Sequence, residues 1–538
     1  MIHRNFRWVH RHILGFIVFL LEQVVTIFNF ASENKTFQTL HTRNYMRKIS
    51  MIRLLHALAF VLVAMGAGAA DFTVDGINYS IKSHADKTVS VTWASSSYQG
   101  DIVIPATITA NDTVWTVSAI GDFAFMQESK VKSVKLPATI NYIGNGAFAY
   151  CTGLTEMKLP AAIRHLGNVS LAGCSAIKHI EMPDSLNFMG TGALSYTAID
   201  TVRVPAGLTT LPAQAFEQCT SLKCVILPEG ITSFGFQAFQ NDRSLTSIVL
   251  PSTLETIGNN CFAFSGLTSM HFPAPFCSYG DNALTAMGSL KAYTVDAANE
   301  YFKAENGILY SKDGKILHSF PLACGMTTLD VQTGVDSIAD FSFYGCALTS
   351  ITLPSSVRGI GKSAFCTSSE ITTFVVPDAV TVIGPYSFSS CPKLKEITLG
   401  SSLKQIGSSA FGNDKALLTV ISRNSVPPVG AKFTNETYTN GKLFVPTDAL
   451  DSYKEADGWK EFLTIKNNSV SMTTDDMTSI SFADGAITVE CEGMVPVMVY
   501  DMAGRCIYRG IGSARIEVAS GATYIVRAGN KTEKVLLR

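Results

Sequence analysis

The histidines and cysteines of this chain are the residues most suited to catalysis or metal binding, and their spacing argues against both. The 538 residues include 10 histidines and 12 cysteines. They form no His-Glu-x-x-His or Cys-x-x-Cys motif, and no Gly-x-Ser-x-Gly or phosphate-loop pattern occurs. We expect His165, His179 and His271 to be surface or packing residues. The sequence therefore predicts no catalytic residue, no metal ligand and no cofactor.

Several cysteines instead recur at separations near 23 residues or multiples of it, each just after an Ala-Phe-like element. They are Cys151, Cys174, Cys219, Cys346 and Cys391. An even number of cysteines permits a disulfide framework. A periodic spacing is, however, more typical of small buried side chains that stack along an interior, so we expect buried thiols.

An apolar residue followed by proline recurs at the same period. The prolines are Pro137, Pro160, Pro183, Pro205, Pro228, Pro251 and Pro273, and the register resumes at Pro354 and Pro377. A second apolar landmark, usually followed by glycine, keeps in phase with it at Ile120, Ile143, Leu166, Phe188, Leu211, Phe234, Ile257, Ile338, Ile360, Ile383 and Ile406. Two landmarks in phase over so many copies indicate a solenoid of repeats of about 23 residues.

Each repeat has a physical logic, illustrated by LTEMKLP at Leu154–Pro160. Because side chains alternate along a strand, Met157 and Leu159 are predicted to point inward and Lys158 outward. Proline cannot donate to a strand ladder and therefore ends the strand. A phenylalanine in most repeats is predicted to join an interior stack, and these residues are Phe125, Phe148, Phe216, Phe239, Phe262, Phe343, Phe365, Phe388 and Phe411.

The bulk composition agrees with a mainly β solenoid. The chain is 47% hydrophobic, which excludes general disorder, and its 41 glycines favour short strands joined by tight turns. Only 16% of residues are charged and the net charge is −1. No basic surface is therefore available for nucleic acid.

The repeated [Leu/Ile]-x-x-[Ile/Val]-x-[Leu/Val]-Pro and Ile-Gly-x-x-Ala-Phe-x-x-Cys patterns, as in IGNGAFAYC at Ile143–Cys151, resemble the BspA-like leucine-rich repeats, also called the Treponema pallidum type. The resemblance covers roughly residues 100–425. It implies a surface or secreted protein of an anaerobic bacterium. Residues 166–194 and 279–284 depart from the pattern, and we expect irregular turns there.

The domain boundaries follow from these patterns and from the flanking composition. We predict an N-terminal β cap at 71–105, repeats at 106–290 and 331–423, a hairpin insertion at 291–330, a C-terminal cap at 424–465 and a linker at 466–478. Tyr453, Trp459 and Phe462 are expected to seal the last repeat.

Two apolar stretches precede the cap. Residues 46–70 have a basic start, an apolar core at Leu54–Met65 and small residues before Asp71, which together are typical of a signal peptide. Residues 1–45 contain an apolar run, Ile13–Phe30, with Glu22 inside it. They are interpreted either as an extension that is not translated or as a membrane anchor.

The C-terminal residues 479–538 show six or seven short alternating strands with glycine turns, which predict a small Ig-like β-sandwich. VMVYDMAGRCIYRG at Val497–Gly510, SGATYIVRAG and the terminal KVLLR resemble the type A sorting domain of type IX secretion in Bacteroidota. That resemblance implies contact with the secretion machinery and association with the outer membrane. An ordinary terminal Ig-like module is the alternative.

The outward position before each apolar-Pro pair is the candidate partner-binding face. Its residues are Lys135, Lys158, Glu181, Arg203, Ile226, Val249 and His271, followed by Thr352, Val375 and Thr398. In a parallel ladder these side chains stand about 4.8 Å apart. A broad, shallow row of this kind suits a protein or glycan surface better than a small substrate, which needs a concave site. A solvated sheet face without a ligand is the alternative.

The sequence therefore predicts an exported cell-surface or secreted repeat protein that binds macromolecular partners without catalysis. The family resemblance implies adhesion to host matrix, host cells or other bacteria. Two other functions remain open: a structural or assembly component of the bacterial envelope, and a surface hydrolase.

Overall fold

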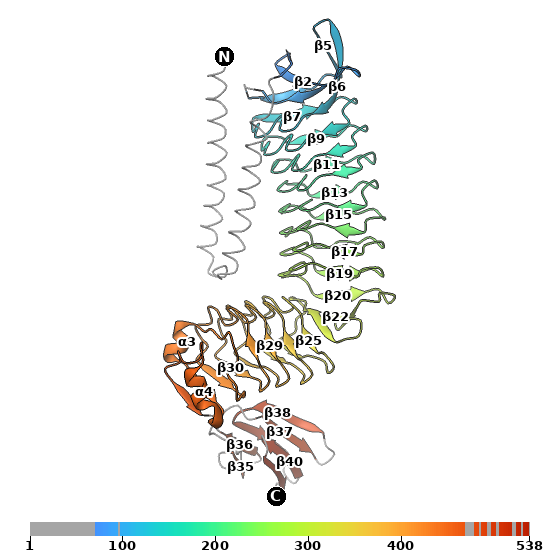
Figure 1. Cartoon of the computed structure of the whole chain (residues 1–538). Coiled ribbons are helices and arrows are strands. Elements are labelled where there is room, and N and C mark those ends of the chain that lie inside the picture. The colour runs from blue at the N-terminus through green and yellow to red at the C-terminus, as the bar shows by residue number, and fades with distance from the viewer. Residues whose placement is uncertain are drawn as a thin grey trace.

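The computed structural model describes residues 70–94, 97–467, 478–483, 486–491, 496–501, 505–518, 523–528 and 531–536. The extension or anchor expected at 1–45 and the signal peptide expected at 46–70 lie outside the described residues, except for Ala70. Among the residues that are described, no helix has the length and apolar character needed to cross a membrane. The described chain is mainly β, and Figure 1 shows its short strands stacked coil upon coil.

The strands that end just before the prolines, together with their equivalents in coils without proline, form the first strand row. They are β4 (Gly100–Val103), β7 (Val131–Lys135), β9 (Glu156–Lys158), β11 (Ile180–Glu181), β13 (Thr201–Arg203), β15 (Cys224–Ile226), β18 (Ser269–Phe272), β20 (Ala292–Val295), β24 (Thr328–Asp330), β26 (Ser350–Thr352), β28 (Thr373–Val375), β30 (Glu396–Leu399), β32 (Thr419–Ser422), β33 (Lys442–Val445) and β34 (Ile465–Asn467). Neighbours pair in parallel at the repeat spacing, as where Met157 aligns with Val134 and with Ile180. The row is divided into several sheets, because adjacent coils do not pair everywhere.

The second strand row carries the apolar landmark that precedes glycine. Its strands are β6 (Thr113–Ile120), β8 (Tyr142–Ile143), β10 (His165–Leu166), β12 (Phe188–Met189), β14 (Thr210–Leu211), β16 (Ser233–Phe234), β17 (Thr256–Ile257), β19 (Ser278–Tyr279), β23 (Ile316–Ser319), β25 (Ser337–Ile338), β27 (Gly359–Ile360), β29 (Val382–Ile383) and β31 (Gln405–Ile406). Where a glycine follows the landmark, it donates its N–H to the preceding coil, as from Gly144 to the carbonyl of Ile120 (2.9 Å). A Cβ on Gly144 would lie 2.6 Å from the backbone nitrogen of Asp122. The close approach of the coils at Gly144 therefore leaves no room for a side chain there.

Two expectations for residues 166–194 are wrong. The coil is regular, because β10 and β12 pair in parallel with His165 opposite Phe188 and Leu166 opposite Met189. Met189 is therefore the inward landmark, at 5% exposure, whereas Phe188 points outward and is 45% exposed. The repeat spacing of 22 or 23 residues allowed either residue, and both are apolar. Residues 279–284 also follow the solenoid rather than an irregular turn, since β17 pairs with β19 up to Tyr279.

The interior contains the predicted phenylalanine stack in several runs. Phe125 and Phe148 lie 5.0 Å apart at 5°, and further runs join Phe216 to Phe262 and Phe343 to Phe411. The first run ends because the next two coils have leucine, Leu171 and Leu194, at the position of the phenylalanine. The periodic cysteines are buried free thiols, as predicted.

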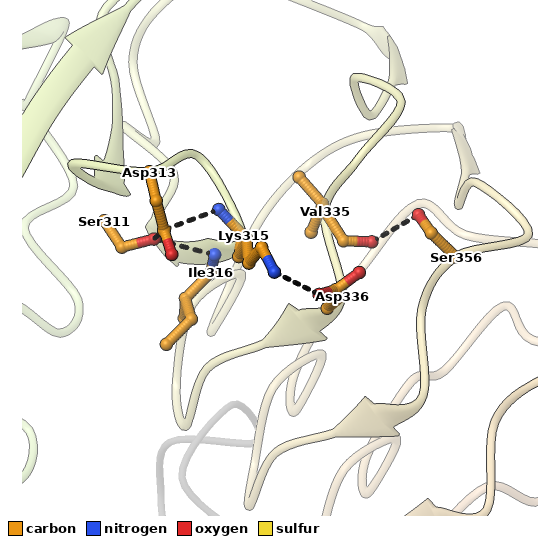
Figure 2. A network of polar contacts seen from close by, with 7 residues as sticks. All are labelled: Ser311, Asp313, Lys315, Ile316, Val335, Asp336 and Ser356. Carbon is orange, nitrogen blue, oxygen red and sulfur yellow. Dashed lines mark hydrogen bonds and ion pairs between the residues drawn. The ribbon is translucent and has the colours of Figure 1, made fainter.

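The insertion between the two sets of repeats is an antiparallel meander of β21 (Phe302–Glu305), β22 (Ile308–Ser311) and β23. The β22–β23 turn is fixed by Asp313, whose Oδ1 accepts hydrogen bonds from Ser311 Oγ (2.7 Å) and Lys315 N (3.0 Å) (Figure 2). Lys315 Nζ then lies 3.7 Å from Asp336 Oδ2 in the following coil. The array changes direction at this insertion (Figure 1).

Additional elements lie at both ends of the array. Residues 71–105, expected as a cap, contain β1 (Phe72–Val74), β2 (Ile77–Ser83), β3 (Thr88–Thr92) and β4, and β5 (Thr107–Ala110) follows. The segment expected as the C-terminal cap contains α3 (Asn435–Asn440), η2 (Thr447–Ala449) and α4 (Leu450–Glu455) as well as β33. Its Tyr453 and Trp459 are fully buried.

The C-terminal residues form two antiparallel sheets. Their strands are β35 (Thr478–Ala483), β36 (Ala486–Cys491), β37 (Pro496–Asp501), β38 (Cys506–Ile511), β39 (Ala514–Glu517), β40 (Thr523–Ala528) and β41 (Lys531–Leu536). One sheet has the order β35-β36-β39 and the other β38-β37-β40-β41. Ile487, Val499 and Val526 lie in one buried cluster formed by residues of both sheets.

Candidate partner-binding face

The predicted face lies along the ends of the first strand row. Its residues are all exposed: Lys135, Lys158, Glu181, Arg203 and Ile226 end β7, β9, β11, β13 and β15, Val249 lies outside any strand, and His271 lies in β18. The inward neighbours are buried as the alternation requires, with Met157 and Leu159 each 4% exposed. The coil geometry thus holds these seven side chains on the solvent side.

Pairing brings some of these residues directly together and leaves others apart. Lys158 lies opposite Glu181, and Arg203 lies opposite Ile226. Between β11 and β13, in contrast, only a single bridge forms. Val249 belongs to the coil between β15 and β18 that contributes no strand to the first strand row. The face is therefore an ordered series of positions over several short sheets.

The charges on this face are solvated. Arg203 Nη1 lies 2.7 Å from Asp184 Oδ1, with the two side chains 55% and 64% exposed. Pairs this exposed contribute little to stability. Lys135 and Lys158 have no ion-pair partner within 4.0 Å among the residues that the structure describes. Their charges therefore remain available to a ligand.

Two apolar residues lie in the middle of the face. Ile226 is 51% exposed, and Val249, at the equivalent position one coil later, is 84% exposed. Charged or polar residues precede and follow them in the row. The continuation of the row beyond the insertion is less uniform: Val375 is 51% exposed, but Thr398, expected to point outward, is only 7% exposed.

The second strand row carries an outward aromatic column that the sequence analysis missed. The Tyr142 and His165 rings stack at 4.4 Å and 12°, and the His165 and Phe188 rings at 4.2 Å and 3°. Lys82 Nζ lies 5.3 Å from the centroid of the Tyr142 ring. Burial lowers the pKa of His165, which favours the neutral imidazole. The sequence did contain a signal for this column. Tyr142, His165 and Phe188 each stand directly before an inward landmark residue, at the repeat spacing.

Within the described residues, no group of three or more histidine, cysteine or acidic side chains could hold a metal ion. The described cysteine thiols in the interior donate to backbone carbonyls, as Cys151 Sγ does to the carbonyl of Phe125 (2.9 Å). The neighbouring Cys174 thiol, through a hydrogen bond, and burial raise the pKa of the Cys151 thiol. These thiols are therefore protonated packing groups rather than nucleophiles.

The parallel coils, the buried landmarks and the outward rows define a leucine-rich-repeat solenoid. The BspA type leucine-rich repeat region matches residues 106–223, 195–306 and 318–438, which together make up more than half of the chain. The chain belongs to this family.

Solved structures of bacterial repeat proteins resemble the chain. A leucine-rich cell surface protein from Faecalibacterium prausnitzii is 23% identical, with a TM-score of 0.52 over 76% of this chain and 97% of that one. A leucine-rich repeat protein from Bacteroides ovatus is 23% identical (TM-score 0.45, 74% and 99% covered). The pneumococcal vaccine antigen PcpA is 19% identical (TM-score 0.43, 74% and 99% covered). No curated protein matches the chain.

Proposed function

We propose that the chain is an exported surface protein that binds protein or glycan partners along the first strand row, without making or breaking bonds. The family membership supports this, as does the description of the Faecalibacterium relative as a cell surface protein. Adhesion to host matrix, host cells or other bacteria is the form of binding we propose.

The exposure of Ile226 and Val249 carries this proposal. Apolar side chains left in solvent on a regular face contribute to binding when a partner covers them. Lys135, Lys158 and Arg203 on the preceding coils supply positive charge that steers an acidic partner and fixes its register. Because the coils repeat at a regular spacing, such contacts can be made at several positions along one row.

Charge reversal tests the face. A triple variant, Lys135→Glu, Lys158→Glu and Arg203→Glu, is compared with the unmodified chain on immobilised extracellular-matrix proteins. We expect binding to weaken at least tenfold while the thermal unfolding midpoint stays unchanged, because all three side chains are exposed. The matched control reverses Lys404, Lys415 and Lys432, which are also exposed but lie elsewhere on the chain. Equal binding by both triple variants would exclude the face.

Further assays on the unmodified chain distinguish the other two functions. An envelope assembly component would bind only other copies of itself. Sedimentation would then show self-association, and the binding assay would show no capture of matrix proteins. A surface hydrolase would release products from polysaccharides or peptides.

We further propose that residues 479–538 are a type IX sorting domain and that residues 46–70 are removed as a signal peptide. The two antiparallel sheets at 478–536 are compatible with the small sandwich that this domain requires. Mass measurement of the mature protein from its native cell tests both. A mature N-terminus before Asp71 would exclude the signal peptide, and retention of Arg538 would exclude removal of the tail.

A further inference from the structure

The aromatic column on the second strand row ends abruptly, and its end is an exposed ring. Tyr142, His165 and Phe188 occupy equivalent positions in three successive coils. Lys82 lies over the Tyr142 ring at the first end. At the other end the next coil offers Thr210, so one face of the Phe188 ring has no aromatic partner. This agrees with the 45% exposure of Phe188.

The column ends where the sheet itself is interrupted. Gly190 N donates to the carbonyl of Leu166 and Gly235 N to that of Leu211, both at 2.8 Å. The equivalent residue between them is Pro212, which has no N–H to donate. Among the described residues, no backbone hydrogen bond joins β12 to β14, and they belong to different sheets. The interruption is confined to β12 and β14, because backbone hydrogen bonds join the two coils again from Gly192 N to the carbonyl of Ala213 (2.9 Å).

Beyond the interruption the same column continues as hydroxyl groups. Thr210 aligns with Ser233, Ser233 with Thr256, and Thr256 with Ser278. All four residues are exposed or half-buried. A hydroxyl both donates and accepts hydrogen bonds. The column therefore places an exposed aromatic ring, which has no second aromatic neighbour among the described residues, beside a line of neutral hydrogen-bonding groups.

We propose that Phe188 and the hydroxyl column bind a neutral polysaccharide, with one pyranose ring packed on the exposed part of the Phe188 ring and its hydroxyls hydrogen-bonded to Thr210 and Ser233. The C–H face of a pyranose ring is apolar and slightly positive, which suits the negative face of an aromatic ring. Its rim of hydroxyls matches the neighbouring threonine and serine. An aromatic side chain of a partner protein would pack on the Phe188 ring but leave the hydroxyls of Thr210 and Ser233 without hydrogen bonds. A sugar can contact both the ring and the hydroxyls, so we favour the sugar.

This site is independent of the function proposed above, because it lies on the second strand row and uses none of the residues of the partner-binding face. It would remain even if the first row bound nothing. The neutral residues of the column favour an uncharged glycan over an acidic one.

Affinity electrophoresis of the full-length chain tests the proposal, with hydroxyethyl cellulose, xylan, mannan or soluble starch incorporated into the gel. We expect at least one of these polysaccharides to retard the chain. Phe188→Ala should weaken the retardation at least tenfold, and Phe188→Trp should preserve or strengthen it. Thr210→Val, which keeps the shape but removes the hydroxyl, should weaken it several-fold.

The matched control is Phe236→Ala, since Phe236 is 41% exposed but follows the landmark rather than preceding it. It should leave retardation unchanged. Because Phe188 is exposed, its replacement should also leave the thermal unfolding midpoint within about a degree of the unmodified chain. No retardation by any of the four polysaccharides, or equal retardation of Phe188→Ala and the unmodified chain, would overturn the proposal. Suppression of Phe188-dependent binding by a phenylalanine-rich peptide but by no oligosaccharide would overturn it as well.

Discussion

One buried position of each coil, three residues after the phenylalanine, shows how a single side chain adapts to the solenoid. In several coils a cysteine thiol there donates to the carbonyl of the preceding coil, as Cys391 does to Phe365 (3.2 Å). Asp242 occupies this position in another coil, where it is fully buried. Neither of its carboxylate oxygens has a hydrogen-bond partner among the described residues. Burial raises the pKa of Asp242, because an unpaired buried charge is unfavourable.

Replacing this carboxyl by the thiol of the other coils should stabilise the array. We expect Asp242→Cys to raise the free energy of unfolding by about 1–3 kcal/mol, the cost of an unsatisfied buried polar group. Denaturant unfolding measures the change. Asp414→Cys is the matched control and should gain less, because Asp414 Oδ1 already accepts a hydrogen bond from Cys391 N (2.6 Å). A loss of stability in Asp242→Cys would contradict this account.

The same carboxyls should make the protein less stable as the pH rises. Burial raises the pKa of Asp242 and Asp414 in the folded chain, and raises that of Glu128 to about 7. The folded state then keeps protons that the unfolded state releases above its ordinary carboxyl pKa of about 4. Stability is therefore greatest below that pH and falls as the pH rises toward the raised values. The unfolding midpoint should fall as the pH rises from about 4 through about 7, where Glu128 titrates in the folded chain, and should fall less steeply in Asp242→Asn/Asp414→Asn.

At the scale of strands, the landmarks predicted the two rows because their physical cause is local. Proline ends a strand wherever it occurs, so the strand of the first row could be derived from Leu154–Pro160 alone. The outward aromatic column could not be derived in this way. A repeat spacing of 22 or 23 residues allows either Phe188 or Met189 to be the residue that points inward. That choice is made by pairing with His165 and Leu166, which is a contact between coils. The missing pairing between β12 and β14, beside Pro212, likewise depends on contacts between coils.

The C-terminal cap should be essential for the end of the array. Trp459 is fully buried and its Nε1 donates to the carbonyl of Pro428 (2.8 Å), where it covers what would otherwise be an open apolar end. We expect Trp459→Ala to cost about 3–5 kcal/mol and to promote self-association, measured by denaturant unfolding and light scattering. Leu463→Ala is the control in the same segment, since Leu463 is 76% exposed. Equal effects of the two changes would show that Trp459 does not seal the end.

At the scale of the whole molecule, the solenoid contains two hydrophobic cores that meet at the insertion. The first extends from Ile77 to Leu309 and the second from Ile308 to Phe462. Strand β22 contributes to both, because Leu309 belongs to the first core and Ile308 and Tyr310 to the second. Polar contacts also join the two sides, including Tyr279 OH with His318 Nδ1 (2.8 Å). The apolar contact at the junction is thus carried by one alternating strand of the sheet that continues from β21 to β31, and it is narrower than the continuous core within each set.

This arrangement predicts two unfolding transitions rather than one. In a repeat array each coil contacts only its neighbours, so cooperativity is lost where the coupling is weakest. We expect Phe148→Ala, in the first core, to destabilise one transition by about 3–5 kcal/mol and Phe388→Ala, in the second core, to destabilise the other by a similar amount. Scanning calorimetry resolves the transitions, and fluorescence of Trp115 and Trp459, which lie in different cores, assigns them. If each substitution shifted both transitions equally, the insertion would transmit stability fully, and the two sets of repeats would be one cooperative unit.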